Sequence, residues 1–155
     1  MKVKVKINNE LKELEVKEGE LLIEVLRREG YKGVKKGCLK GECGACAVLL
    51  NNRPVNSCLV LAADIDGMEV ITIEGLAKET EPNIIQKSFV EAGAVQCGYC
   101  TPGMVISTKA LLDRISEPTD EEIKKALDGN LCRCTGYVKI IDAVKLAVSR
   151  LKIKT

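Results

Sequence analysis

Residues 37–46 read GCLKGECGAC, and this stretch decides how the first half of the chain folds. It holds three cysteines, Cys38, Cys43 and Cys46, interleaved with three glycines. Glycine adopts left-handed and tight backbone conformations without a Cβ penalty, so the stretch predicts a loop rather than a helix or a strand. We expect this loop to turn its backbone amides inward, toward a group held by the three sulfurs.

Cysteine organises the rest of the chain as well, because the sequence contains eight cysteines and no histidine. They fall into two sets of four with different spacing. The first set is Cys38, Cys43, Cys46 and Cys58, and the second set is Cys97, Cys100, Cys132 and Cys134. The run C-x4-C-x2-C in the first set is the spacing of plant-type 2Fe–2S ferredoxins. We therefore predict that each set holds one 2Fe–2S cluster.

Zinc is the main alternative to iron and sulfide, because four-cysteine zinc sites also use C-x2-C pairs. The second set alone leaves zinc open, whereas the glycine-rich first set favours a cluster. The lack of histidine excludes Rieske-type clusters and zinc fingers that combine cysteine with histidine. Disulfides are disfavoured, because no apolar signal segment is visible and the cytoplasm, where we expect the protein, keeps thiols reduced.

The composition of the 155 residues argues against several kinds of function. A formal net charge of +2 and an aromatic content of 3% do not indicate binding to nucleic acid. No stretch approaches the ~20 apolar residues of a membrane span. Since histidine is absent and the cysteines are assigned to clusters, no nucleophile–base pair remains. We therefore predict no catalytic residue in this chain.

Residues 1–76 are expected to form an α+β domain. Valine and isoleucine alternate with lysine between residues 2 and 7, the period of two that is typical of a half-buried strand. The expected elements are a β-hairpin over residues 2–17, a helix over 20–29, and short strands near 47–50 and 69–73. Returning strands around one helix indicate a small mixed domain.

Residues 83–155 are expected to form an all-α domain, reached through a polar linker at 77–82. Four helices are predicted: one over 83–91, a second with Thr101 as N-cap and Pro102 at the first helical position, a third that begins with the capping pair Thr119 and Glu122, and a fourth from about residue 137. Their short connections predict an antiparallel four-helix bundle.

Three stretches carry a resemblance to a known family: GCLKGECGACAVLL at 37–50, AVQCGYCTPGMV at 94–105 and GNLCRCTGY at 129–137. They resemble the small iron–sulfur subunit of the molybdenum hydroxylases, the family of xanthine dehydrogenase, aldehyde oxidoreductase and the small chains of bacterial carbon monoxide dehydrogenase. The resemblance covers nearly the whole chain. It implies a β-grasp ferredoxin-like domain that holds the first cluster and a helical domain that holds the second.

The resemblance also implies partners and an order of electron transfer. A large subunit would hold molybdopterin–molybdenum and a medium subunit would hold FAD, in a hetero-oligomer such as a dimer of heterotrimers. Electrons would pass from molybdenum through the second cluster and then the first cluster to FAD. Gln96 and Cys134 would lie against the pterin, although the residues alone describe Gln96 more simply as a surface or capping amide.

Two other functions stay open at this point: a stand-alone two-cluster ferredoxin-like carrier and a zinc-stabilised interaction module. A carrier needs only the first domain, so the second cysteine set argues against it. Tyr99, between two cysteines of the second set, is interpreted either as a shield of the cluster or as packing at a subunit contact. The substrate of the complex is beyond what this sequence specifies.

Overall fold

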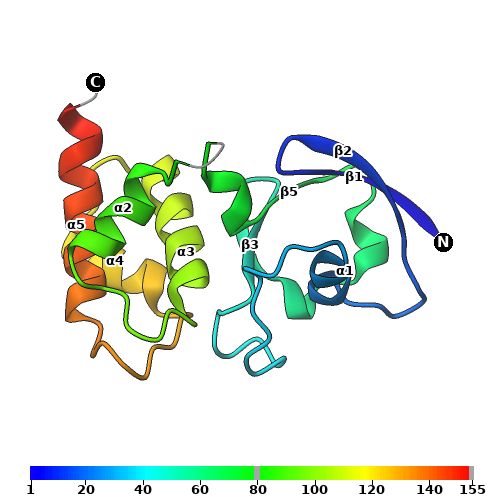
Figure 1. Cartoon of the computed structure of the whole chain (residues 1–155), viewed down its shortest axis with the longest axis horizontal. Helices are drawn as coiled ribbons and strands as arrows, with labels where there is room; N and C mark the ends of the chain where they lie inside the picture. The colour runs from blue at the N-terminus through cyan, green and yellow to red at the C-terminus, as the bar shows by residue number, and fades with distance from the viewer. Residues whose placement is uncertain (79–80, 154–155) are drawn as a thin grey trace.

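Strands fill one half of the molecule and helices fill the other (Figure 1). The structure is a computed structural model, and it describes residues 1–78 and 81–153. Part of the predicted linker at 77–82 lies outside these described residues. The α+β class expected from the sequence is confirmed by the succession of elements.

The strands form one five-stranded mixed sheet. They are β1 (Lys2–Ile7), β2 (Glu10–Glu15), β3 (Ala47–Leu50), β4 (Arg53–Asn56) and β5 (Glu69–Ile71). The spatial order is β2-β1-β5-β3-β4, so β2 and β4 are the two edges. The strands β1 and β5 are parallel, and the other neighbouring pairs are antiparallel.

The predicted hairpin is present, and its alternation explains why. Val3, Val5 and Ile7 are fully buried while the lysines between them are exposed. The turn consists of Asn8 and Asn9, which adopt φ angles of +49° and +73°. Asparagine tolerates left-handed conformations in two-residue hairpin turns, so these two residues fix the register of β1 against β2.

The helix α1 spans Leu22–Arg28 and is shorter than the predicted range of 20–29. Its N-terminal side is shortened because the Glu20 carboxylate accepts the backbone amide of Lys17 at 3.0 Å, which forms a turn before the helix. At the other end Gly30 takes a φ of +98°, as expected of a residue that follows a helix.

One strand prediction needs correction. The strand expected near 69–73 ends at Ile71, because the next amide, of Thr72, bonds to the Asn8 side chain at 2.9 Å rather than to the sheet. The strand β4 was given no range from the sequence, and it contains Pro54. Proline cannot donate a ladder hydrogen bond, and it is tolerated here because β4 is an edge strand.

Four helices follow in the second half, close to their predicted ranges. They are α2 (Ile84–Glu91), α3 (Thr101–Arg114), α4 (Asp120–Leu127) and α5 (Val138–Ile153). Within the described ranges, no helix combines the length and apolar character needed to cross a bilayer. The capping pair Thr119 and Glu122 is confirmed, and Asn83 and Gln86 form a second capping box on α2.

The N-cap of α3 was predicted wrongly. It is Cys100, which already has near-helical angles of φ −79° and ψ −18°, and Thr101 is the first helical residue. The hydroxyl of Thr101 is buried without a hydrogen-bond partner in the described part of the chain. The helix therefore begins directly at a cysteine of the second set.

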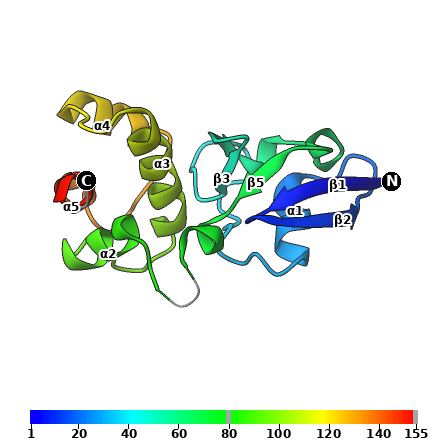
Figure 2. The ribbon, with the colours of Figure 1, turned by 90° about the horizontal axis from the view of Figure 1, so that it is seen from above.

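The helix α3 joins the two halves. It packs against β3 and β4 on one side and against the other helices on the other. Figure 2 shows it standing between the sheet and the remaining helices. Ala47 and Leu49 of β3 accordingly belong to the buried cluster of the helical half, whereas most of the sheet packs into a separate cluster around α1.

We predict that Thr119→Ala lowers the free energy of unfolding by about 1 kcal/mol, because the amide of Glu122 loses the side-chain oxygen that caps α4. Urea unfolding of the cluster-loaded protein, followed by far-ultraviolet circular dichroism, measures this loss. Lys125→Ala, at an exposed position of the same helix, is the control and should stay within about 0.5 kcal/mol of the original chain. Equal stability of the two variants would contradict the capping role.

Candidate metal centres

The first cysteine set lies on the loop between α1 and β3, with Cys58 on a turn after β4. Cys38 Sγ accepts hydrogen bonds from three backbone amides of this loop. These amides belong to Lys40, Glu42 and Cys43, at 3.3, 3.3 and 3.4 Å. The amide of Cys38 donates in turn to Cys43 Sγ at 3.4 Å. The loop turns its amides toward sulfur, as its glycine-rich sequence predicts.

The curl of this loop depends on two residues with positive φ. Gly41 has a φ of +79°, which glycine adopts without strain. Leu39 has a φ of +56°, which costs a residue with a side chain about 1–2 kcal/mol. The sequence assigned this freedom to glycine alone. The two positive φ angles bring the amides of Lys40 and Glu42 onto the same sulfur.

The other two sulfurs of the first set are buried beneath the loop, since Cys46 and Cys58 are each only 3% exposed. Burial raises the pKa of the Cys58 thiol to about 11, and the adjacent thiol of Cys46 raises it further. By contrast, the amide of Lys40, followed by that of Cys43, lowers the pKa of Cys38 to about 7. Cys38 also acts on Cys58, so the thiols of the set lie beside one another.

The second cysteine set surrounds a cavity of about 190 Å³. Its four thiols all line this cavity, together with Gly37, Cys43 and Ala45 of the first loop and the side chains of Tyr99, Leu131 and Arg133. Cys97 and Cys134 are exposed, whereas Cys100 and Cys132 are half-buried. Burial raises the pKa of Cys100 to about 12, with a further contribution from the thiol of Cys132.

Thr135 and Tyr137 support the second set, and sequence reasoning missed both. The Thr135 hydroxyl lies 3.1 Å from Cys132 Sγ, and its amide donates to the same sulfur at 3.5 Å. The Tyr137 hydroxyl accepts the amide of Cys132 at 2.9 Å. Both residues stand in the quoted stretch 129–137, so their proximity to cysteine was the available signal.

The two donor sets have the chemistry that a 2Fe–2S group requires. Each offers four thiols, and in each a sulfur receives backbone amides of the kind that stabilise bound thiolate. The thiols of the second set line a cavity rather than surround the position of a single atom. The residues present therefore fit the group.

Gln96 lies at the exposed side of the second set. Its side chain is exposed, and it directly precedes the exposed Cys97. The Cys97 thiol hydrogen-bonds with that of Cys134 and raises the pKa of Cys134. Of the two residues predicted to face a pterin, Cys134 lines the second cavity, and Gln96 is exposed and next to Cys97 in the sequence.

Tyr99 has a role that neither sequence interpretation named. Its hydroxyl donates a hydrogen bond to the backbone carbonyl of Lys36, so the second cysteine loop is tied to the first. Asn130 and Ser107 were not singled out, although both are buried beside these loops. Both are polar residues, and the sequence alone did not indicate that their positions are buried.

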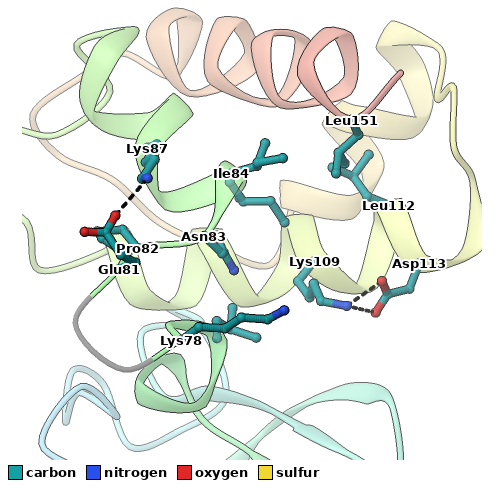
Figure 3. A pocket seen from close by; sticks show the side chains of 12 residues that line it. Lys78, Glu81, Pro82, Asn83, Ile84, Lys87, Lys109, Leu112, Asp113 and Leu151 are labelled. Carbon is teal, nitrogen blue, oxygen red and sulfur yellow. Dashed lines mark hydrogen bonds and ion pairs between the residues drawn. The ribbon is translucent and has the colours of Figure 1, made fainter. Parts of the chain in front are cut away.

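A larger cavity, of about 640 Å³, lies elsewhere in the helical half (Figure 3). Aliphatic side chains from α2, α3 and α5 form much of its wall, and its described lining contains no cysteine. Four of its charged groups form two ion pairs: Lys87 with Glu81 at 3.1 Å and Lys109 with Asp113 at 2.5 Å. This cavity is therefore not part of either metal centre.

Comparison with known proteins places each cysteine set within the range of a 2Fe–2S domain. Residues 5–70 match the 2Fe-2S iron-sulfur cluster binding domain, and residues 72–145 match the 2Fe-2S binding domain that is described as a separate family. The nicotinate dehydrogenase small FeS subunit of Eubacterium barkeri is 50% identical over 149 residues, which cover 96% of this chain and 95% of that protein. The chain belongs to the small iron–sulfur subunits of the molybdenum hydroxylases.

Two further relatives of this subunit extend the comparison. The xanthine dehydrogenase iron-sulfur-binding subunit of Escherichia coli O157:H7 is 48% identical over 128 residues, covering 81% of this chain and 80% of that protein. The crystal structure of quinoline 2-oxidoreductase from Pseudomonas putida 86 contains a chain with a TM-score of 0.94 and 36% identity, covering 99% of the subunit and 96% of that chain. The fold is therefore that of the family.

We predict that Cys38 is the most readily alkylated thiol of the first set in the metal-free subunit. The thiolate is the reactive form, and it exists above the pKa, so iodoacetamide labelling of Cys38 should rise through a midpoint of about pH 7. Cys58, whose pKa is about 11, should remain unlabelled at pH 8 and serves as the internal control. Mass spectrometry of the digested protein measures both, and labelling of Cys58 before Cys38 would contradict the prediction.

Proposed function

We propose that the subunit is the electron-transfer component of a molybdenum-dependent hydroxylase or dehydrogenase. The observation that carries this proposal is the adjacency of the two cysteine sets, since Cys43 and Ala45 of the first loop line the cavity of the second set. When bound, each cluster accepts and returns one electron at a time, which links two-electron chemistry at molybdenum to a flavin. The subunit supplies position, insulation and hydrogen bonds to sulfur.

The ligands of the two clusters are assigned to the two sets. Cys38, Cys43, Cys46 and Cys58 bind the first cluster, and Cys97, Cys100, Cys132 and Cys134 bind the second. The amides directed at Cys38 and the donors of Thr135 directed at Cys132 support this assignment, because such bonds stabilise thiolate and tune reduction potential.

The partners are a large subunit with molybdopterin–molybdenum and a medium subunit with FAD. Gln96 and Cys134 face the pterin in this proposal, which the exposure of both residues supports. The complex is a hetero-oligomer, with a dimer of heterotrimers as its expected form. A cytoplasmic location agrees with the eight cysteines, none of which forms a disulfide in the structure.

The same proposal extends to the domains. Residues 1–76 form a β-grasp ferredoxin-like domain, 77–82 a linker, and 83–155 a helical domain built as a four-helix bundle. The two separate buried clusters support a division into domains. The packing of α2 against α5 and of α3 against α4 supports the bundle.

Two experiments separate this function from its alternatives. A stand-alone carrier would elute by itself in gel filtration of native extract, whereas the proposed subunit elutes with larger molybdenum-containing and flavin-containing chains. A zinc-stabilised module would contain zinc in place of iron after anaerobic purification. The lack of both partner chains and iron would rule out the electron-transfer role.

We predict about four iron atoms and about four acid-labile sulfides per chain in the anaerobically purified complex, because each set holds one 2Fe–2S group. Reduction with dithionite should give two distinct electron paramagnetic resonance signals of one spin each. Cys43→Ser should abolish or alter one signal, and Cys100→Ser should do so for the other. If either substitution left both signals unchanged, the ligand assignment would be wrong.

A further inference from the structure

The loops that carry the two cysteine sets touch each other through their backbones. The amide of Leu131, which directly precedes Cys132, donates to the carbonyl of Cys43 at 2.9 Å. The two residues therefore connect a ligand-bearing loop of one half to a ligand-bearing loop of the other. From Cys43 Sγ to Cys132 Sγ, the chain offers a route of covalent bonds interrupted by a single hydrogen bond.

Two glycines make this approach possible. A Cβ atom on Gly44 would lie 2.3 Å from the carbonyl oxygen of Gly129, and a Cβ atom on Gly103 would lie 2.3 Å from the carbonyl oxygen of Gly44. Real Cβ atoms do not approach other atoms so closely. Any side chain at either position would force the first loop away from α3 and from the segment that carries Cys132.

The buried side chain of Asn130 stabilises this contact between the two loops. It is 5% exposed, and its side-chain amide lies between both loops. In the orientation that satisfies each end, Nδ2 donates to the carbonyls of Gly44 at 3.2 Å and Gly103 at 3.3 Å. Oδ1 then accepts from the Ser107 hydroxyl at 2.8 Å. One buried side chain thus holds the first loop and two turns of α3 together.

The Asn130 side chain and the next backbone amide act on neighbouring carbonyls. The side chain holds the carbonyl of Gly44, and the amide of Leu131 holds that of Cys43. If the Asn130 bond is lost, the Gly44 carbonyl keeps only the backbone amide of Ala47, at 3.1 Å, as its donor. The first loop then loses its side-chain bond to the segment before Cys132. The bond at Cys43 and the spacing of the two sets then change together.

We propose that Asn130 is a positioning residue for electron transfer between the two clusters. By holding the Cys43 carbonyl on the Leu131 amide, it fixes the separation of the clusters and keeps the bonded route between them intact. In the step that it supports, the second cluster is oxidised by one electron and the first is reduced by the same electron. This inference rests on the proposed function. The separation of the clusters matters because the rate of electron tunnelling falls steeply with distance.

The test uses Asn130→Ala in the complete complex, with electron paramagnetic resonance as the readout. We expect both cluster signals to remain, while the magnetic interaction between the two reduced clusters weakens. The rate of electron transfer between the clusters, followed by rapid mixing and freezing, should fall below that of the original complex. The reduction potentials of both clusters, measured in a redox titration, should stay as in the original complex. A change in these potentials would assign the slower transfer to altered potentials instead of altered position, and would overturn the positioning role.

Thr108→Val is the matched control. Thr108 is fully buried on the same helix, and its hydroxyl bonds only to the Met104 carbonyl at 2.8 Å, within α3. This variant removes one buried polar group without touching the contact between the loops. It should keep the interaction and the transfer rate of the original complex.

A second variant covers the case in which Asn130→Ala does not assemble. Ser107→Ala removes only the hydroxyl that supports Asn130, and we expect the transfer rate to fall by less than in Asn130→Ala. Original rates and interaction in an assembled Asn130→Ala variant, or in Ser107→Ala, would overturn the positioning role. An original complex without two cluster signals would instead overturn the proposed function.

Discussion

The backbone contact between the first cysteine loop and the segment before Cys132 is the constraint on which the rest of the structure depends. It brings a carbonyl and an amide together across the two halves, where ordinary side chains would keep them apart. Both cysteine sets flank this contact, so the distance between them is set by backbone geometry. The buried Asn130 side chain supports this geometry by holding the neighbouring carbonyl of Gly44, which suits a protein whose function depends on fixed spacing.

Apolar packing keeps that contact in place. The helix α3 begins at a second-set cysteine, runs along β3 and β4, and packs on its other side against the remaining helices. Because Ala47 and Leu49 of β3 are buried in the helical cluster, the halves share part of one core. The centres are therefore held by a rigid support of several elements, as precise sites require.

Local signals explain how much of this could be predicted from the sequence. The alternation in β1, the Asn8–Asn9 turn and the Thr119–Glu122 pair act between neighbouring residues, so pattern alone finds them. The cysteine spacing likewise predicts two metal sets. The strand β4 is joined to β3 by the turn of Asn51 and Asn52, so its signal was as local as that of the first hairpin. The bridges through Tyr99 and Asn130 depend on contacts between distant segments, and no local pattern encodes those contacts.

The two edges of the sheet have a consequence for assembly. An open edge strand invites another strand to pair with it, which leads to aggregation. Here β2 contains three glutamates and one lysine, and β4 is only four residues long and contains Pro54. Both edges thus discourage edge-to-edge extension of the sheet by a second copy. The folded subunit is therefore protected at these edges against aggregation by strand pairing.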